Sequence, residues 1–303
     1  MTRALLILNP GSRAGRSQHQ WAPWIRALNQ ADWLVAAQPT TSLQHARELA
    51  AAADPYDTVV AVGGDGTISA VISGVMERPA PRPRVGVLYA GTSPDFCRFH
   101  GLPTTPAAAV EALIGGEARP IDLVKITFHS REGRPQTAHV ACSVNVGLGP
   151  PIARRANRWR PWCGDALGTA LAAIWSICRH PTFDATVTID GHPQPLTGIA
   201  NLAVMKNPHI ASGLRCGLAL TPTDGRLGIC AVYGRGRAGL LALLPAFYCG
   251  TLSHRVGVTL ETCKRVSVRA REEVEIEFDG DPQGYLPIDV AIKHEALRLI
   301  IPR

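Results

Sequence analysis

The turn that joins a buried strand to a helix near residue 63 constrains this chain more than any other part of its sequence. A strand is expected over residues 57–62 and a helix over residues 68–76. The turn between them consists of Gly63, Gly64, Asp65, Gly66 and Thr67. Glycine permits positive φ and lets backbone N–H groups approach an anion, and the helix N-terminus adds a favourable dipole. The pattern therefore predicts a phosphate-binding turn.

Asp65 needs a partner if this turn binds phosphate, because a carboxylate repels phosphate groups unless a cation lies between them. The sequence therefore implies Mg²⁺ at this position. The alternative is an ordinary tight turn in which Asp65 caps the following helix, and the local sequence leaves both interpretations open.

Strands and helices alternate over the first part of the chain. Strands are expected at 4–8, 31–37, 57–62 and 84–88, and helices at 42–53 and 68–76. Such alternation implies a parallel sheet, whose ligands bind beyond the carboxyl ends of the strands. The strand at 84–88 runs into a second loop of small residues, with Gly91, Thr92 and Asp95. Two such loops from neighbouring strands would converge on one crevice.

The pattern changes after about Asp122 to strand-like runs with few helices. These runs cover 186–189, 198–205, 227–232, 265–269 and 274–278. Helical segments rich in Leu and Ala interrupt them at 166–177 and 238–248. The second part of the chain is therefore expected to form a β-rich domain.

Composition limits the class of protein. The 303 residues suffice for two domains, and 46% hydrophobic with 18% charged residues is typical of a folded chain. No apolar stretch reaches the roughly 18 to 20 residues of a spanning helix, so a cytoplasmic protein, soluble or peripheral, is expected. The eight cysteines form no Cys-x-x-Cys pair and are expected to be reduced. The net charge of +7 suits nucleic acid, an anionic membrane or a polyphosphate without ranking them.

Six motifs together resemble the diacylglycerol kinase catalytic family, which includes bacterial diacylglycerol, sphingosine and ceramide kinases. In the family's order they are the segments 9–15, 63–67, 91–98, 121–123, 224–227 and 279–281. Six motifs in the right order are far more specific than any single one.

The resemblance implies a fold and a domain organisation. We expect residues 1–121 to form an α/β nucleotide-binding domain of the NAD kinase and phosphofructokinase type. Residues 122–289 would form a C-terminal β-sandwich that takes the lipid acceptor, with the nucleotide in a cleft between the domains. The tail, from about 290 to 303, would return to the first domain.

The resemblance also implies an ATP- and Mg²⁺-dependent lipid kinase whose site has a catalytic base, metal-binding carboxylates and nucleotide contacts. Asp279 would be the catalytic base, assisted by Asp281, and Asp65 would serve both catalysis and the metal. The magnesium carboxylates would be Asp65, Asp95 and Asp122, and Asp224 would hold a structural cation or act as a simple turn carboxylate. The nucleotide contacts would be Asn9, Arg16, Gly63, Gly64, Gly66, Thr67, Gly91 and Thr92.

Three positions depart from the family pattern. Pro94 stands where the family has Asn, and Asp281 stands where it has Glu. The segment 211–217 stands where relatives have three glycines followed by a proline. These changes leave open an unusual acceptor or a catalytically weakened nucleotide- or lipid-binding homologue.

The acceptor is the least determined part of the reaction. Trp159, Trp162 and Trp175 lie near four arginines, a mixture suited to a membrane interface but also to buried tryptophans beside a solvated basic loop. A kinase of the same fold that acts on a soluble alcohol is a second interpretation. Nucleic acid is not expected, because only charge supports it. A homodimer is expected from the relatives alone.

Overall fold

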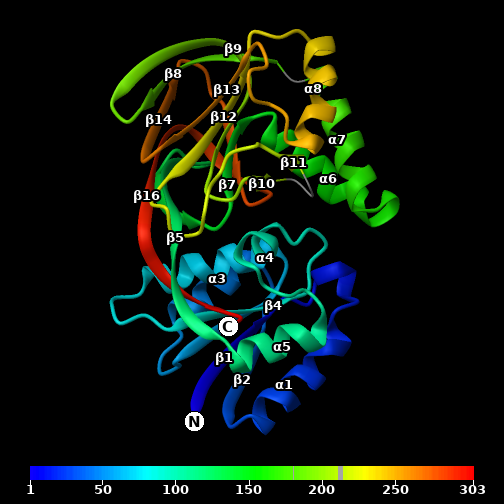
Figure 1. Ribbon diagram of the computed structural model, residues 1–303, viewed down its shortest axis with the longest axis vertical. Helices are drawn as coiled ribbons and strands as arrows, with labels where there is room; N and C mark the ends of the chain where they lie inside the picture. Colours follow the sequence, from blue (N-terminus) through cyan, green and yellow to red (C-terminus); the bar gives the residue numbers. More distant parts are fainter. Residues whose placement is uncertain (180, 211–213) are drawn as a thin grey trace. The chain divides into compact units, whose positions relative to one another are not determined.

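The computed structural model describes residues 1–179, 181–210 and 214–303 of the chain, which divide into two compact units. Unit 1 comprises Met1–Asp122 and Glu295–Arg303, and unit 2 comprises Leu123–His294 (Figure 1). The chain leaves unit 1 within β5 (Glu117–Ser130) and returns to it within β16 (Asp281–Ile301).

Unit 1 is built on a parallel sheet. Its strands, in spatial order, are β2 (Trp33–Pro39), β1 (Thr2–Leu8), β3 (Thr58–Gly63), β4 (Arg84–Tyr89) and the end of β16. The parallel register pairs Leu6 with Val60 and Val60 with Gly86, and Leu299 of β16 joins β4 at Val85. Every residue of β3 is buried, as expected for a parallel strand covered on both faces.

Helices follow the strands of unit 1 in alternation. They are α1 (Trp21–Gln30), α2 (Leu43–Ala51), α3 (Asp65–Glu77), α4 (Asp95–His100) and α5 (Pro106–Gly115), with 3-10 turns η1 (Ser12–Gly15) and η2 (Gln18–Gln20). Ser42 caps α2 by accepting a hydrogen bond of 3.0 Å from the N–H of His45, as the sequence predicts. Helices α2 and α3 pack so closely that a Cβ on Gly74 would lie 2.1 Å from the carbonyl oxygen of Arg47. The α/β fold expected for this part is confirmed.

Unit 2 is a β-sandwich with antiparallel pairing. One run of neighbours is β13 (Val258–Cys263), β12 (Leu227–Tyr233), β9 (His192–Met205), β7 (Ser143–Gly147), β15 (Glu275–Phe278) and β16. The other strands are β6 (Pro135–Val140), β8 (Phe183–Ile189), β14 (Arg265–Ala270), β10 (His209–Ile210) and β11 (Leu214–Arg215). Because β8 pairs with β9 and β14 pairs with β8 and β16, the long strands β9 and β16 are shared by both layers. The expected β-sandwich is confirmed.

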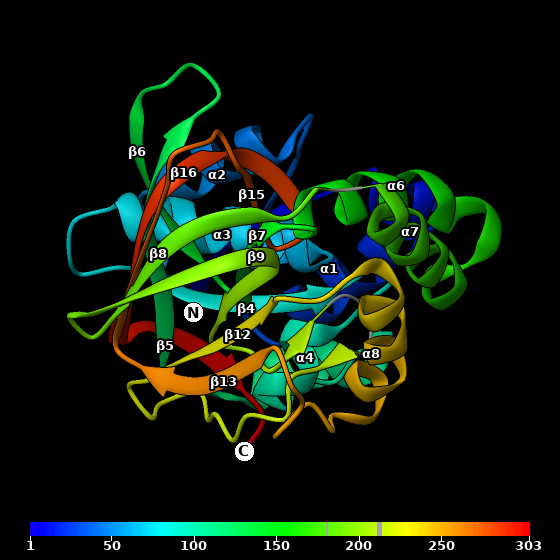
Figure 2. The same ribbon diagram turned by 90° about the horizontal axis from the view of Figure 1, so that it is seen from above.

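Three helices lie on one side of the unit 2 strands in Figure 2, namely α6 (Gly149–Cys163), α7 (Asp165–Arg179) and α8 (Arg237–Cys249). The sequence predicts α7 and α8, but the arginine-rich stretch before α7 is a helix and not the loop considered above. Pro150 and Pro151 follow Gly149 in the first turn of α6, where N–H groups have no partner inside the helix. Among the described residues, no helix is both long enough and apolar enough to cross a membrane.

Candidate functional site

The glycine turn after β3 and the loop after β4 are in direct contact in unit 1. A Cβ added to Gly91 would lie 2.5 Å from the Cα of Gly64, and one added to Gly64 would lie 3.1 Å from the Cα of Gly91. A side chain at Gly91 would force the backbone apart, and one at Gly64 would be tight. The carboxyl ends of two adjacent strands thus present bare backbone side by side, which is the kind of surface that phosphate oxygens bind.

Asn9 joins the first loop of the chain to the glycine turn. Its Nδ2 donates to the Oγ1 of Thr67 at 2.8 Å, and its Oδ1 accepts from the N–H of Gly11 at 2.9 Å. Thr67 in turn closes over Gly63, whose Cβ would lie 2.4 Å from the threonine Oγ1. Gly66 is less confined, since the nearest described atom to its Cβ would belong to Leu43, at 3.5 Å.

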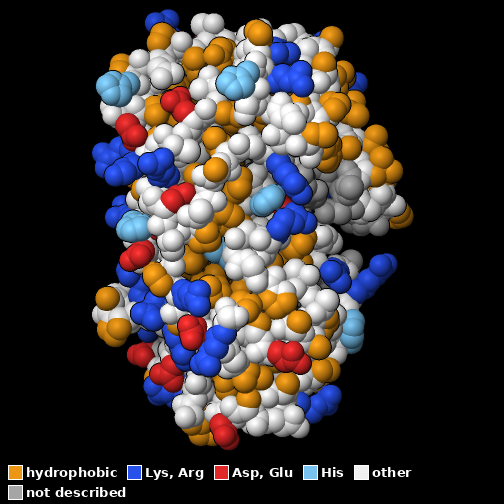
Figure 3. All heavy atoms as spheres, viewed as in Figure 1, with side chains coloured by type: hydrophobic (Ala, Val, Ile, Leu, Met, Phe, Trp, Pro, Cys, Tyr) orange, Lys and Arg blue, Asp and Glu red, His pale blue; other side chains and the backbone are white. Residues whose placement is uncertain are grey.

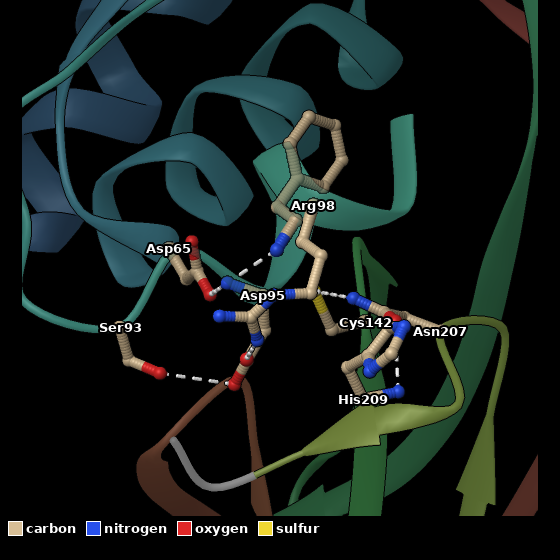
Figure 4. A network of polar contacts seen from close by, with 8 residues as sticks. Asp65, Ser93, Asp95, Arg98, Cys142, Asn207 and His209 are labelled. Carbon is tan, nitrogen blue, oxygen red and sulfur yellow. Dashed lines mark hydrogen bonds and ion pairs between the residues drawn. The ribbon is translucent and has the colours of Figure 1, made fainter. Parts of the chain in front are cut away.

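Asp65 caps a helix, but not the helix in which it lies. Its Oδ2 accepts hydrogen bonds from the N–H groups of Asp95 at 3.1 Å and Phe96 at 3.4 Å, as Figure 4 shows. These are first-turn donors of α4 that have no partner inside that helix. Pro94, at the N-cap of α4, makes no side-chain cap bond, so Asp65 supplies the acceptor from the neighbouring loop.

The carboxylate of Asp95 is buried and held on both oxygens. Ser93 donates to its Oδ2 and Arg98 to its Oδ1, each at 3.1 Å (Figure 4). The carboxylate of Asp122 has a different task, because its Oδ1 accepts from the N–H of Glu295 at 2.9 Å where the C-terminal segment returns to unit 1.

The structure does not gather the three predicted magnesium carboxylates, Asp65, Asp95 and Asp122, into one group. Among the residues described, no three His, Cys, Asp or Glu side chains are placed to hold a metal ion. Mg²⁺ in phosphoryl-transfer sites is commonly held by one or two carboxylates together with the phosphates, and not by a cage of protein ligands. Asp65, in the glycine turn, fits that arrangement. Asp95 lies beside it, with both carboxylate oxygens held by Ser93 and Arg98. Asp122 instead accepts from the returning segment.

Arg13, which the sequence did not single out, reaches the second loop. Its Nε donates to the carbonyl oxygen of Gly91 at 2.8 Å, and its backbone has a positive φ of 50°. Arg16, the predicted cation of this loop, is exposed, as are Arg13 itself and Thr92. Spacing alone could not choose between the two arginines, because the choice depends on the turn that Arg13 makes.

The hydroxyl group of Tyr89 lies beneath the two loops. It is buried, it would contact a Cβ on Gly91 at 2.7 Å, and it finds no hydrogen-bond partner among the described residues. Burial raises the pKa of this hydroxyl well above its usual range, and the negative charge of Asp65 adds to the effect. A buried phenol at the base of the cradle is a polar feature that no sequence motif indicated.

Asp279 in unit 2 anchors the loop that leads into β7. Its carboxylate accepts from the N–H groups of Ala141 and Cys142, both at 2.9 Å, and of Ser143 at 3.1 Å. Three backbone donors fix the orientation of this carboxylate closely. Asp281 follows it by two residues, and burial raises the pKa of Asp281 despite the opposing charge of Arg131.

Glu277, which the motifs did not indicate, lies beside this turn and is 5% exposed. It accepts from Asn145 at 2.6 Å and from the N–H of Gly280 at 2.8 Å. Burial raises the pKa of its carboxyl to about 8, against the lowering effect of these two hydrogen bonds. Asp279 and Asp281 also raise it.

Asp224 is paired with a protein cation. The ammonium group of Lys206, a fully buried residue, lies 2.5 Å from its Oδ1. Burial opposes ionisation of Asp224, but hydrogen bonds from Lys206 and from the N–H groups of Thr221 and Arg226 hold its pKa below the usual range. In this structure the cation beside Asp224 is the ammonium group of Lys206, and a metal ion at Asp224 stays a prediction. Of the altered glycine segment, residues 211–213 lie outside the described residues.

Two family models match the chain. One, described as the diacylglycerol kinase catalytic domain, matches residues 3–126, and the other, described as the YegS C-terminal NAD kinase beta sandwich-like domain, matches residues 142–301. The chain is 27% identical over 259 residues to a diacylglycerol kinase of Mycobacterium tuberculosis, an alignment that covers 84% of this chain and 80% of that one. It is 36% identical over 132 residues to a diacylglycerol kinase of Bacillus subtilis, or 42% of each chain.

Solved structures show the same fold. A crystal structure of a putative diacylglycerol kinase from Bacillus anthracis superposes with a TM-score of 0.79 at 20% identity and covers 99% of this chain and 97% of that one. Yeast NADH kinase in complex with NADH superposes with a TM-score of 0.57 at 13% identity, over 100% of this chain and 84% of that one. The chain therefore belongs to the diacylglycerol kinase family with a YegS-type C-terminal domain, and is a phosphotransferase with an alcohol group as acceptor.

Proposed function

We propose that the protein transfers the γ-phosphoryl group of ATP, with Mg²⁺, to the hydroxyl group of a lipid such as diacylglycerol, ceramide or a sphingoid base. The observation that carries the proposal is the contact between Gly64 and Gly91, because two bare backbones at adjacent strand ends form the cradle that a polyphosphate requires. The lipid acceptor is supported by the names of the matched relatives, which are diacylglycerol kinases.

The nucleotide is assigned to unit 1. Backbone N–H groups of the glycine turn and the Gly91 loop would bind the phosphates, with Thr67 held in place by Asn9. We expect Arg13 and not Arg16 to be the cation of this site, because Arg13 already contacts the Gly91 loop. Mg²⁺, when bound with the nucleotide, would neutralise charge on the transferring group, and we expect Asp65, with Asp95 beside it, to face the ion.

The acceptor and the base are assigned to unit 2. The acceptor oxygen would attack the γ-phosphorus while the bond from that phosphorus to the ADP oxygen breaks, and the hydroxyl proton would pass to Asp279. The three N–H donors on the Asp279 carboxylate hold it in one orientation, which suits a base that must meet a hydroxyl group at a fixed place. Asp281 would assist from the same turn.

A lipid surface is the proposed partner of the α6–α7 pair. A cavity of about 470 Å³ between these helices is lined by Trp159, Cys163, Leu171, Ile174, Trp175 and Cys178. Trp162 at the end of α6 is 89% exposed, and Leu167 in α7 is 56% exposed. Hydrophobic side chains also gather along the outer side of α7 and α8 in Figure 3. Such a surface suits acyl chains, with indole rings at the level of the headgroups.

Basic side chains surround this apolar surface. Arg155 and Arg179 stack on the ring of Trp175, with 3.5 Å and 4.3 Å from guanidinium carbon to ring centroid, and Arg158 is exposed. Their positive charge would favour anionic headgroups. The stacking also shows that two of the arginines help to order the helices, so their charge does not serve the membrane alone.

The proposal is tested by γ-phosphate transfer from labelled ATP to diacylglycerol, ceramide, sphingosine and soluble alcohols, with and without Mg²⁺ and in mixed micelles. Phosphorylation of one lipid that stops when Mg²⁺ is chelated is the expected result. Transfer only to a soluble alcohol would assign the protein to a different acceptor class. ATP binding without transfer to any acceptor would point to a weakened homologue. The cytoplasmic location and the homodimer stay predictions.

A further inference from the structure

Glu277 is a buried carboxyl group whose position in the fold is unusual. It lies in β15 directly opposite Asn145 of β7, so its side chain enters the interior of unit 2 and not the solvent. Taking a carboxyl group out of water is costly unless hydrogen bonds compensate. Packing alone does not explain why a carboxyl group is buried two residues before Asp279.

Glu277 and Asn157 hold the peptide groups of Gly280 from two sides. The Oε2 of Glu277 accepts from the N–H of Gly280 at 2.8 Å. The carbonyl oxygen of the same glycine accepts from the Nδ2 of Asn157, on α6, at 3.3 Å. Gly280 is the residue between Asp279 and Asp281, so both contacts act on the turn that carries these two carboxylates.

The turn needs such support because its backbone is in an uncommon conformation. Asp279 has a φ of 52° and Gly280 a φ of 88°, so two consecutive residues are left-handed. A non-glycine residue in this region costs of the order of 1 kcal/mol or more and persists where its surroundings determine it. The Glu277 contact and the three N–H bonds to Asp279 are such determinants.

A chain of amides connects Glu277 to the start of α6. Asn145 donates to Glu277, Asn201 donates to the Oδ1 of Asn145 at 3.4 Å, and Gly149 donates through its N–H to the Oδ1 of Asn201 at 3.0 Å. Gly149 is the first residue of α6, the helix that also carries Asn157. The turn and the helix are therefore held by one connected network.

We propose that Glu277 is a positioning residue for phosphoryl transfer, which fixes Gly280 and thereby sets the orientation of the Asp279 and Asp281 carboxylates. The inference rests on the proposed function, because it assigns Glu277 a task in that reaction. Glu277 acts through the turn, and Asp279 remains the group that meets the acceptor. The raised pKa of Glu277 agrees with this position, because burial disfavours the charged form of a carboxyl group.

The test compares two ways of changing Glu277 in the full chain. Glu277→Met keeps the length of the side chain and removes both acceptors. The double exchange Glu277→Gln with Asn145→Asp keeps an oxygen toward Gly280 and an amide–carboxylate pair in the interior, with the acid and the amide reversed. Each variant is checked by its melting temperature and by ATP binding, which is assigned to unit 1 and serves as the control for folding.

Glu277→Met is expected to lower kcat for the lipid acceptor by roughly tenfold to hundredfold with the KM for ATP unchanged, because a misplaced reacting group costs about that much. The double exchange is expected to restore most of the kcat. A folded Glu277→Met variant with the kcat of the wild type, or a double exchange no better than Glu277→Met, would overturn the positioning role while the proposed function stands.

Hydrogen exchange of the Gly280 amide tests the positioning role of Glu277 separately from the proposed kinase function. The amide is expected to exchange faster in Glu277→Met than in the wild type, and equal protection would show that Glu277 does not hold the turn. A wild type that phosphorylates no lipid would overturn the proposed function. The exchange rate at Gly280 would still decide whether Glu277 fixes the turn.

Discussion

Asp65 caps the helix that begins at Asp95, through a hydrogen bond of 3.1 Å from the backbone N–H of Asp95 to its Oδ2. The carboxylate in the glycine turn thus joins the two loops that form the phosphate cradle. This cap is visible without any ligand, whereas the proposed contact with a nucleotide-bound Mg²⁺ depends on the negative charge. Substitutions at this position can separate the two tasks.

Asp65→Asn is expected to keep the cap and lose the charge. Its amide oxygen can still accept from α4, so its free energy of unfolding should stay close to that of the wild type, while Asp65→Ala should lose about 1 kcal/mol. Both should lower kcat by tenfold or more if the carboxylate faces Mg²⁺. Chemical denaturation and Mg²⁺ titration of the transfer rate provide the two measurements. An Asp65→Asn variant with normal kcat and normal Mg²⁺ dependence would show that Asp65 only caps α4 and does not bind the metal.

Gly91→Ala is expected to weaken ATP binding sharply. The new methyl group would lie 2.5 Å from the Cα of Gly64, so the two loops must separate and the N–H groups must move away from the phosphates. Gly115→Ala is the matched control, because a Cβ there would meet no atom of another described segment within 4 Å. Isothermal titration with an ATP analogue should show a loss of about tenfold or more for Gly91→Ala and none for Gly115→Ala. Equal affinities would show that the close approach of the loops is not required for the nucleotide.

Either Arg13 or Arg16 could be the cation that contacts the nucleotide phosphates, and substitutions at the two positions distinguish them. Both side chains are exposed, but that of Arg13 donates to the Gly91 carbonyl oxygen, so Arg13→Met is expected to raise the KM for ATP more than Arg16→Met. A hydrogen bond that involves a charged group contributes roughly 1.5 to 3 kcal/mol, which corresponds to a clear change in KM. Steady-state kinetics at saturating lipid measures the difference. A larger effect from Arg16→Met would restore the interpretation made from the sequence.

Trp162 provides the test of the lipid surface. Trp162→Ala is expected to reduce co-sedimentation with anionic vesicles, since it removes the most exposed aromatic side chain of the α6–α7 pair, which is 89% exposed. Leu34→Ala, in unit 1, is the control because it also removes an exposed apolar side chain, which is 56% exposed there. Binding should weaken as salt rises, because the headgroup attraction is electrostatic. Equal loss in both variants would mean that the attachment is not specific to this surface.

The sequence predicted the fold class of each part of the chain, α/β and then β-rich, because the signals for it are local. Strand and helix alternate at fixed spacing in the first part, and Ser42 marks a helix start that the structure shows. Helix α6 was missed because Pro150, Pro151 and the arginines resemble a loop, although proline is compatible with the first turn of a helix.

The parts of the candidate site that were not predicted depend on contacts between distant segments. Arg13 could be preferred to Arg16 only once the backbone at Arg13 was known. Glu277 looked like any residue of an alternating strand until its pairing with Asn145 placed it inside the unit. Lys206, the cation beside Asp224, lies 18 residues before it and belongs to no motif.

Glu277 should make the stability of the protein depend on pH in a direction opposite to that of an ion-paired carboxylate. Burial raises the pKa of Glu277 from 4.5 to about 8, helped by Asp279 and Asp281 and opposed by the hydrogen bonds from Gly280 and Asn145. Between these two values the folded protein keeps a proton that the unfolded chain has released. The free energy of unfolding must therefore fall as the pH rises, by at most about 1.4 kcal/mol per pH unit, and the decline should end above about pH 8.

Glu277→Gln cannot titrate and isolates this effect. Urea unfolding of the wild type and of the variant at several pH values between 5 and 9 gives the difference in stability, from which groups common to both proteins cancel. The wild type is expected to lose stability relative to the variant as the pH rises toward 8, and the difference should then become constant. A difference that stays constant from pH 5 to 9 would show that the Glu277 carboxyl does not titrate in this range. The pKa of Glu277 in the folded protein would then be lower than its burial implies.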